Sequence, residues 1–213
     1  GKEADVNGWM TQLDDDTIAL QYSFIKSNSH PLGEKHQLDD PGADSDYAAV
    51  HARYHPVIRR FLEEFEYYDI FLADPDSGDI IYSVFKELDY STSLKNGPFA
   101  NTGIGEVFRK ANQAESRDTV FISDFAPYPP SYEDPAAFIA SPVFEGNQKI
   151  GVLIFQMPID RINTVMTHNG RWAQKGLGES GETYLLGEDS RMRSISRFLL
   201  EDKPGYGDAL RAA

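Results

Sequence analysis

Two apolar runs in the second half of the chain are joined by a short polar connection. Residues 136–144 and 150–157 are rich in β-branched and aromatic side chains, and Glu145-Gly146-Asn147-Gln148 lies between them. Strand-forming runs joined by a Gly/Asn connection of this length indicate a β-hairpin. The pattern therefore predicts two long antiparallel strands at this point.

A second pair of apolar runs lies earlier, at 68–73 and 79–84. Between them, residues 74–78 read Asp-Pro-Asp-Ser-Gly, which is a strong turn sequence. A shorter run at 120–123 adds one more strand. Together with the later hairpin, these runs predict five antiparallel strands.

Apolar residues at helical spacing precede the strands. The spacing predicts helical structure over residues 5–27, with an interruption near Asp14 where an N-cap restarts the helix. A second helix is predicted over 45–65, with a kink or break at Pro56. A short helix is predicted over 103–114. Strands interrupted by one helical stretch imply an α+β fold with helices on one face of the sheet.

After Asp160 the pattern starts again on a smaller scale. A short helix at 161–166 is followed by two strand-like runs, 182–186 and 191–196, joined by a turn. One hairpin does not bury a sheet by itself, so this second unit reads as truncated. We therefore predict three regions: an N-terminal helical region, a sensor-sized module and an incomplete second module, at 1–65, 66–167 and 168–213.

Composition narrows the function classes. Hydrophobic content of 40% indicates an ordered globular chain, and the net charge of −14 argues against nucleic acid and anionic lipid as partners. The chain has no cysteine, which excludes disulfides, thiol nucleophiles and zinc–thiolate sites. No apolar run approaches the ~20 residues that span a bilayer. Both ends look like cut ends, so we expect part of a longer protein.

Several motifs in this order resemble one protein family, the double Cache (tandem PAS-like) extracytoplasmic sensor regions of bacterial chemoreceptors and sensor histidine kinases. The resemblance covers roughly residues 45–200, and its order is more specific than any single motif. The segment 178–186 with Met192-Arg-Ser194 is similar to the start of that family's membrane-proximal module. The other motifs are Tyr67-Tyr-Asp-Ile-Phe-Leu72, Val84-Phe-Lys-Glu87, Pro135-Ala-Ala-Phe-Ile139 and Gly151-Val-Leu-Ile-Phe-Gln-Met-Pro-Ile-Asp160.

The resemblance implies a PAS-like sheet, a ligand in the membrane-distal module, and helix shifts that set a cytoplasmic kinase or methyl-accepting output. It also implies an inner-membrane protein with this region in the periplasm, and a possible homodimer through the N-terminal helices. Family members that bind amino acids carry an Arg with a neighbouring Trp-Tyr pair. This chain has Arg109 and Arg117 without such a pair, which argues against an amino-acid ligand.

A proline- and tyrosine-rich segment before the long hairpin is the predicted wall of a small-molecule site. Prolines stiffen it, and tyrosines offer a ring with a hydroxyl group. Asp124 is expected to accept hydrogen bonds from a ligand or to cap the loop, and Lys86 is the nearest cation for an anionic ligand. Simple packing of the aromatic residues is the alternative. The candidate ligand-binding residues are Tyr82, Lys86, Asp124, Phe125, Tyr128, Ser131, Tyr132 and Phe138.

Other chemistry is scarce in the sequence. His51 and His55 share a helix face at zinc-compatible spacing, but no His-Glu-x-x-His motif occurs, and a structural pair is the favoured interpretation. Asp69 is expected to hold backbone rather than ligand. We predict no catalytic residue, metal ligand or cofactor. The alternatives to a small-molecule sensor are a carboxylate-dependent extracellular hydrolase and a sensor of a partner protein.

Overall fold

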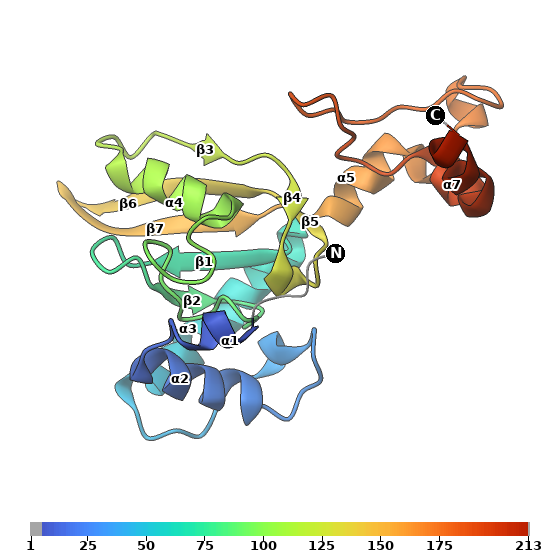
Figure 1. The fold of residues 1–213 in the computed structure, drawn as a ribbon. Coiled ribbons are helices and arrows are strands. Elements are labelled where there is room, and N and C mark those ends of the chain that lie inside the picture. The colour runs from blue at the N-terminus through green and yellow to red at the C-terminus, as the bar shows by residue number, and fades with distance from the viewer. Residues whose placement is uncertain (1–5, 213) are drawn as a thin grey trace. The chain divides into compact units, whose positions relative to one another are not determined.

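The computed structural model describes residues 6–212, which divide into two compact units between Met157 and Pro158. The first unit contains the sheet and the helices that cover it (Figure 1). The second contains short helices and turns. Each unit is described by itself.

The main sheet has five strands in the order β2-β1-β7-β6-β3, and every neighbouring pair is antiparallel. This arrangement confirms the predicted five-stranded antiparallel sheet. The long hairpin turns at Gly146, which has φ of 57°. The strands are β1 (Asp69–Ala73), β2 (Ile80–Ser83), β3 (Phe121–Ile122), β6 (Phe138–Glu145) and β7 (Gln148–Gln156).

The strand register places three residues in one row across the sheet. Asp69 of β1 lies opposite Gln156 of β7, and Gln156 lies opposite Phe138 of β6. Residues directly opposite each other on paired strands project to the same face. A carboxyl group, an amide and a phenyl ring are therefore brought side by side at one end of the sheet.

The face that carries this row is covered by α4 (Gly103–Gln113), and we call it the α4 face (Figure 1). The helix buries Ile104, Val107 and Phe108, which are all 0% exposed. Their i, i+3, i+4 spacing is the apolar stripe of an amphipathic helix. They pack in one cluster with Phe71 and Ile154 of the sheet. The predicted helix over 103–114 is thus confirmed, and it closes the principal core.

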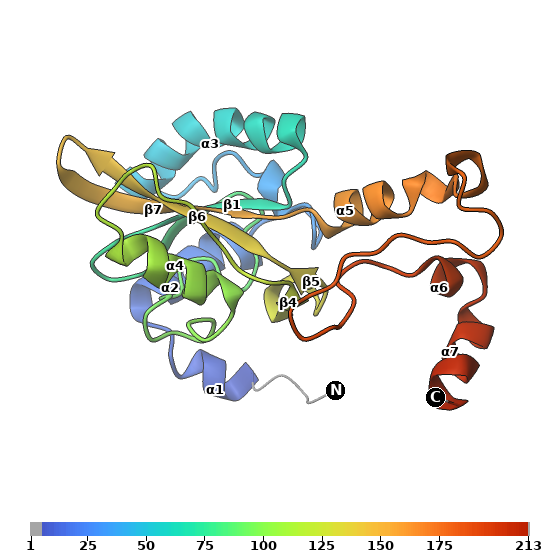
Figure 2. The ribbon, with the colours of Figure 1, turned by 90° about the horizontal axis from the view of Figure 1, so that it is seen from above.

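The opposite face of the sheet is covered by α3 (Asp46–Phe65), and we call it the α3 face (Figure 2). Helices therefore lie on both faces, and the expectation of helices on one face was wrong. The Ser45 side chain caps the helix by accepting from Ala48 N at 3.1 Å. The predicted break at Pro56 is also wrong, because the helix continues through it. Buried contacts of His55 and Leu62 on either side hold the helix together.

Short helices precede α3, namely α1 (Val6–Met10) and α2 (Asp15–Gln21), followed by a π-helical turn at Tyr22–Lys26. The Asp14 carboxylate accepts from Thr17 N at 2.7 Å, as the predicted N-cap requires. The π-turn places Phe24, which is 2% exposed, against the rest of the first unit. A 3₁₀ turn, Lys35–Gln37, lies in the loop that leads to α3.

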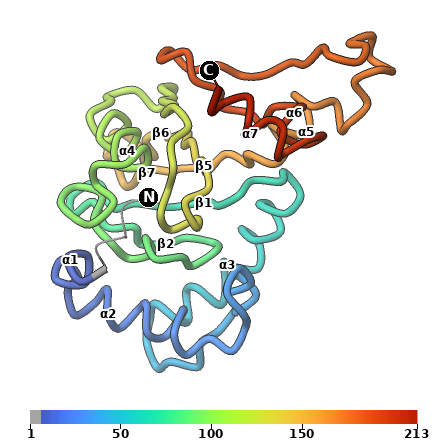
Figure 3. The backbone as a smooth tube through the Cα atoms, turned by 45° about the vertical axis from the view of Figure 1, so that its right-hand side comes forward, coloured from blue at the N-terminus to red at the C-terminus, as the bar shows by residue number. Residues whose placement is uncertain are grey.

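The segment between β3 and β6, residues 123–138, lies across the α4 face of the sheet (Figure 3). The sequence predicts an irregular stiff loop here, but the structure contains a small ribbon of β4 (Ala126–Pro127) and β5 (Pro135–Ala136). A 3₁₀ turn, Pro129–Ser131, closes the ribbon. Tyr132, which follows the turn, adopts a positive φ of 58°. We call residues 123–138 the cover segment.

The second unit shows less regular structure than predicted. The expected hairpin over 182–196 is reduced to a single bridge between Leu186 and Met192. An isolated two-stranded hairpin without a sheet to join is marginal, which explains the loss of the strands. The elements of this unit are α5 (Ile159–Met166), the 3₁₀ turns His168–Gly170 and Ala173–Lys175, α6 (Arg197–Glu201) and α7 (Lys203–Ala212).

Arg197 organises this second unit. Its guanidinium donates to the carbonyl oxygens of Gly178 and Gly181 at 3.0 and 2.9 Å, and lies 4.9 Å from the Trp172 ring centroid. Glu182 accepts from the Arg197 backbone N–H at 2.8 Å. Residues of the segment 178–197 therefore form a network of polar contacts. The predicted interpretation as the start of a second module stays a prediction.

Candidate functional site

A group of buried polar side chains lies at one end of the α4 face, between the sheet and the cover segment. Strand β1 and the residue before it supply two members, the loop after β2 supplies two, the cover segment two, and β7 one. We call this group the carboxyl layer. Its members are Tyr68, Asp69, Glu87, Asp89, Tyr128, Ser131 and Gln156.

Asp69 is completely buried at the start of β1. Its Oδ1 accepts from the backbone N–H groups of Ile70, Val84 and Phe85, at 2.6, 2.9 and 3.2 Å. This confirms the expectation that Asp69 holds backbone. Burial, and then the nearby Asp89 carboxyl, raise the pKa of Asp69 to about 7.

Glu87 and Asp89 hold the cover segment against the sheet. Glu87 accepts from Tyr68 Oη at 2.9 Å and from Ser131 Oγ at 3.1 Å, and Asp89 accepts from Tyr128 Oη at 2.6 Å. Burial is the main reason that the pKa of Glu87 is raised to about 8 and that of Asp89 to about 6. Carboxyl groups with such pKa values are typical of functional sites, although structural networks also produce them.

Lys86 places a buried cation beside the layer. The residue is 2% exposed, and its ammonium donates to Ser83 O and lies 4.5 Å from the Tyr82 ring centroid and 5.0 Å from that of Tyr90. Burial lowers the pKa of Lys86 to about 7, and the Asp69 charge opposes that shift. The Lys86 ammonium is therefore enclosed by rings rather than solvated, and whether it contacts an anionic ligand stays a prediction.

Two pockets lie against the cover segment. The larger has a volume of about 410 Å³ and the smaller about 180 Å³. The larger is lined by Asn101, Thr102, Gly103, Glu106, Arg109, Asp124, Ala126, Pro127, Tyr128, Ala136 and Phe138. The smaller is lined by Ile25, Leu32, Gly33, Lys35, Phe85, Lys86, Glu87, Leu88, Pro129, Pro130 and Tyr132.

The structure distributes the predicted ligand-binding residues over several places. Asp124, Tyr128 and Phe138 line the larger pocket. Lys86 and Tyr132 line the smaller one.

The other three predicted residues line neither pocket. Ser131 belongs to the carboxyl layer, Phe125 is half-buried, and Tyr82 packs in the cluster on the α3 face. The eight residues therefore do not form one wall, as the sequence suggested. Whether they contact a ligand stays a prediction.

Sequence reasoning did not single out Glu87, Asp89 or Gln156. The first two lie in an irregular stretch with no hydrophobic period, and Gln156 reads as an ordinary strand residue. Their partners are remote in sequence, because Tyr128 is 39 residues from Asp89 and Ser131 is 44 residues from Glu87. The available signal was the set of acidic residues immediately after a buried strand.

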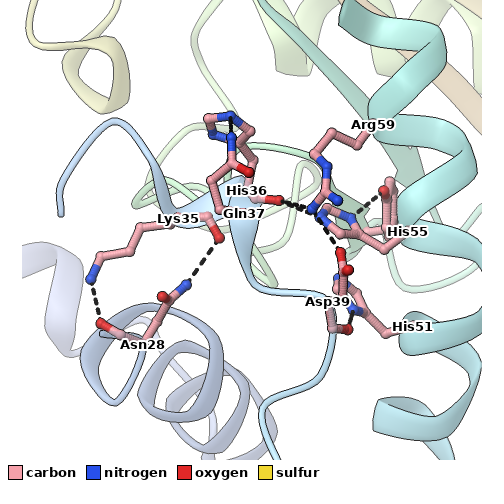
Figure 4. Close-up of polar contacts among 9 residues, drawn as sticks. Asn28, Lys35, His36, Gln37, Asp39, His51, His55 and Arg59 are labelled. Carbon is pink, nitrogen blue, oxygen red and sulfur yellow. Dashed lines mark hydrogen bonds and ion pairs between the residues drawn. The ribbon is translucent and has the colours of Figure 1, made fainter. Parts of the chain in front are cut away.

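A second buried polar group, which we call the histidine cluster, lies on the α3 face (Figure 4). It consists of His36, His51 and His55 with Tyr82. His55 Nε2 donates to His36 O at 2.7 Å and its Nδ1 accepts from Tyr82 Oη at 2.8 Å, while His51 Nδ1 lies 2.8 Å from Asp39 O. The two helix histidines stack with ring centroids 4.3 Å apart.

The histidine cluster is structural, as the sequence interpretation favoured. Burial, and then the nearby Lys86 charge, lower the pKa of His51 to about 4 and that of His55 to about 3. Neutral rings bonded to backbone carbonyls hold the loop before α3 against that helix. Among residues 6–212, no group of three or more His, Asp or Glu side chains is placed to hold a metal ion.

No protein-family model and no curated protein matches the chain. Solved structures do resemble it. The ligand-binding domain of the Campylobacter jejuni chemoreceptor Tlp3, in complex with 4-methylisoleucine, is 9% identical with a TM-score of 0.50, over 93% of this chain and 69% of that one. The likeness shows that the chain shares its fold with that ligand-binding domain.

Two further structures belong to Pseudomonas receptors. The ligand-binding domain of the amino-acid chemoreceptor PctC of Pseudomonas aeruginosa PAO1, in complex with GABA, is 14% identical, with a TM-score of 0.42 over 91% of this chain and 78% of that one. That of Pseudomonas fluorescens CtaA, in complex with L-isoleucine, is 11% identical, with a TM-score of 0.39 over 62% of this chain. The chain spans 46% of the CtaA domain's length.

Proposed function

We propose that this chain is the ligand-sensing region of a bacterial transmembrane signalling receptor, and that a small molecule binds between the sheet and the cover segment. The observation that supports this most directly is the fold, together with a pocket of about 410 Å³ on its α4 face. Small-molecule sites are concave, with an apolar lining and a few convergent polar groups. The larger pocket is concave and more polar than this average, since Thr102, Arg109 and Asp124 share its lining with the Tyr128 and Phe138 rings.

The signal leaves the site through the elements that the ligand touches. The cover segment is tied to the loop after β2 by the Tyr128–Asp89 and Ser131–Glu87 hydrogen bonds. A ligand that favours one arrangement of these contacts shifts the population of receptor states, since only differential affinity moves such an equilibrium. We propose that the shift reaches a cytoplasmic kinase or methyl-accepting output.

The cellular setting follows from the same proposal. The intact receptor is anchored in the inner membrane by segments outside this chain, with the sensing region in the periplasm. Within residues 6–212, no helix combines the length and apolar character needed to cross a membrane. The receptor forms a homodimer through its N-terminal helices.

The carboxylate-dependent hydrolase is less well supported. Glu87 and Asp89 accept hydrogen bonds from the hydroxyl groups of Tyr68, Ser131 and Tyr128. General acid–base catalysis needs a carboxyl group that exchanges a proton with the substrate, whereas the described bonds of these two groups run to protein hydroxyl groups. The two groups act here as attachment points for the cover segment.

A thermal-shift screen of the purified chain against a metabolite library tests the proposal. Binding to the native state raises the melting temperature by mass action, so we expect a clear rise with at least one compound. Asp124→Ala and Tyr132→Ala alter different pockets, and each is compared with the unaltered chain. Loss of the shift in Asp124→Ala alone identifies the larger pocket. A silent library together with turnover of a model ester or glycoside would contradict the proposal.

A further inference from the structure

The carboxyl layer contains more acceptors than donors. Three buried oxygens, Asp69 Oδ2, Asp89 Oδ1 and Gln156 Oε1, have no hydrogen-bond partner among the described residues. Asp69 and Asp89 are 0% exposed and Gln156 is 2% exposed. Buried acceptors are nearly always paired, because an unpaired one has lost its water without a replacement. Each of these three oxygens can accept a hydrogen bond from a donor that the described residues do not supply.

The three oxygens belong to one place in the molecule. Asp69 and Gln156 are opposite each other in the sheet register and project to the same face. Ser131 Oγ joins Gln156 to Glu87, with distances of 3.0 Å from Gln156 Nε2 and 3.1 Å to the Glu87 carboxylate. The Asp89 carboxyl is close enough to Asp69 to raise the pKa of Asp69.

The charge of the layer points to the same missing group. Its carboxyl groups on Asp69, Glu87 and Asp89 face a single buried ammonium, that of Lys86, which donates to Ser83 O and is enclosed by aromatic rings. Buried carboxylates with so little compensation are costly unless a cation joins them. A primary ammonium group has one positive charge and three N–H donors, which matches three orphan acceptors.

We propose that the carboxyl layer recognises the protonated amino group of the ligand, and that the ligand is an amine without a carboxylate. This inference rests on the proposed sensing function and names its ligand class. A ligand carboxylate would be repelled by Glu87, Asp89 and Asp69. The one cation beside the described layer is the Lys86 ammonium, which also has three carboxyl groups to compensate.

The larger pocket provides room for the rest of the ligand. Tyr128 connects the two places, because its side chain lines the pocket and its hydroxyl donates to Asp89 at 2.6 Å. The Tyr128 and Phe138 rings pack edge to face with centroids 5.0 Å apart, so aromatic surface lies next to the layer. Aromatic faces attract cations. The pocket's lining includes one cation, Arg109, beside two acidic residues, Glu106 and Asp124.

Isothermal titration of the full chain at pH 8 with a matched series tests the ligand class. The series is 1,4-diaminobutane, 4-aminobutanoate and butanedioate, which differ in how many ends are amino groups, together with 2-phenylethylamine and 3-phenylpropanoate. We expect binding by the two amines and none by the acids without an amino group. We expect 4-aminobutanoate to bind at least about tenfold more weakly than 1,4-diaminobutane, because one charged contact is worth that much.

Three variants connect this binding to the layer. Asp89→Asn keeps the acceptor for Tyr128 but removes the charge, and should weaken amine binding about tenfold or more. Gln156→Glu adds a charge at the same atoms and should tighten it. Asp76→Asn, at an exposed turn position, is the matched control and should leave affinity unchanged. Circular dichroism shows whether Asp89→Asn folds. If it does not, the amine affinity of Gln156→Glu alone tests the placement of the site.

The outcomes separate the inference from the function that it deepens. Tight binding of 4-aminobutanoate or butanedioate with no binding of the amines would overturn the amine assignment and leave the sensor intact. Amine binding that is unchanged in both Asp89→Asn and Gln156→Glu would overturn the site. No binding by any member of the series also overturns the inference. The proposed function fails as well if the metabolite library gives no thermal shift.

Discussion

The histidine cluster and the carboxyl layer lie on opposite faces of the sheet, and they differ in the chemical groups that form their hydrogen bonds. In the histidine cluster, His55 donates to a backbone carbonyl and accepts from the Tyr82 hydroxyl, and the rings are neutral. Two of its ring nitrogens, His36 Nδ1 and His51 Nε2, are buried without a hydrogen-bond partner among the described residues. In the carboxyl layer, hydroxyl and backbone N–H donors bond to carboxyl groups, and three oxygens have no such partner. Both groups therefore contain unpaired atoms, and they differ in charge, with neutral rings on one face and carboxyl groups on the other.

The comparison also shows why burial alone does not identify a site. Both groups lie close to Lys86, and burial is the largest cause of the pKa shift in each. For histidine, burial favours the neutral ring, which is the form that bonds a carbonyl. For the carboxyl groups, burial favours the protonated form, and a nearby cation would shift the balance back toward the ionised form. The excess of carboxyl groups over cations, rather than the depth, distinguishes the functional candidate.

The largest effect is expected from removing the carboxyl group that is most fully bonded. Asp69→Ala removes the side-chain acceptor of the Ile70 and Phe85 N–H groups, whereas the Val84 N–H keeps its bond to Ile70 O at 3.2 Å. At about 1–3 kcal/mol for each buried unsatisfied group, the free energy of unfolding should fall by about 2–6 kcal/mol in urea denaturation. Asp69→Asn keeps the accepting oxygen and should lose less. Equal stability of Asp69→Ala and Asp69→Asn would show that the hydrogen bonds to this side chain do not stabilise the fold.

A smaller loss of stability is expected from a substitution in the histidine cluster, on the α3 face. His55→Ala removes a ring that is 0% exposed and leaves Tyr82 Oη without its acceptor, while His36 O keeps only the Arg59 guanidinium at 2.8 Å. The cavity and the lost bonds together should reduce the free energy of unfolding by about 2–4 kcal/mol in urea denaturation. Ligand affinity should be unchanged in titration, because the cluster faces away from the larger pocket. A loss of affinity with normal folding would remove the distinction between the two groups.

The two groups should respond to pH in opposite directions. The folded-state pKa of Asp89 is about 6, above its usual 3.8, so its contribution is complete below pH 3.8 and is lost as pH rises through 6. Asp69, Glu87 and Lys86 titrate nearby, so the contribution of Asp89 is measured by difference from Asp89→Asn. Between pH 4 and 6, the unaltered chain should lose stability relative to the variant in urea denaturation. A constant difference would contradict the burial argument for the layer.

For His51 the folded-state pKa is about 4, below its usual 6.5, so its contribution is present above pH 6.5 and is lost as pH falls through 4. Lys86, Asp39 and Arg59 also act on the pKa of His51, so a difference from His51→Gln isolates the residue. The unaltered chain should lose stability relative to the variant between pH 6.5 and 4. The opposite slope would mean that His51 is held as a cation.

The parts of this structure that the sequence could predict are those with local causes. Alternating apolar runs located the five strands, and Asp14 and Ser45 act as caps where capping residues precede an apolar stripe. The carboxyl layer has no local cause. Its contacts join residue 69 to 84, 87 to 131 and 89 to 128, and an irregular loop carries no periodic signal. The sequence pattern identified the aromatic residues of the cover segment, but it did not identify the residues that they contact.

The smallest effect on stability is expected from a substitution on the solvent-exposed side of helix α3. The two faces of the sheet also differ in how much apolar surface their covering elements expose. The α4 face is covered by α4 and the cover segment, with the larger pocket between them, whereas α3 leaves an apolar stripe open, with Val57 65% and Phe65 60% exposed. Val57→Lys should change the free energy of unfolding by no more than about 0.5 kcal/mol, because the side chain has little contact to lose. If the stripe pairs two copies of the chain, as the homodimer prediction requires, sedimentation should show the variant to be monomeric. A variant that stays dimeric would place the interface elsewhere, and a monomeric unaltered chain would leave the stripe without that partner. A large loss of stability would mean that α3 is packed more tightly than its exposure indicates.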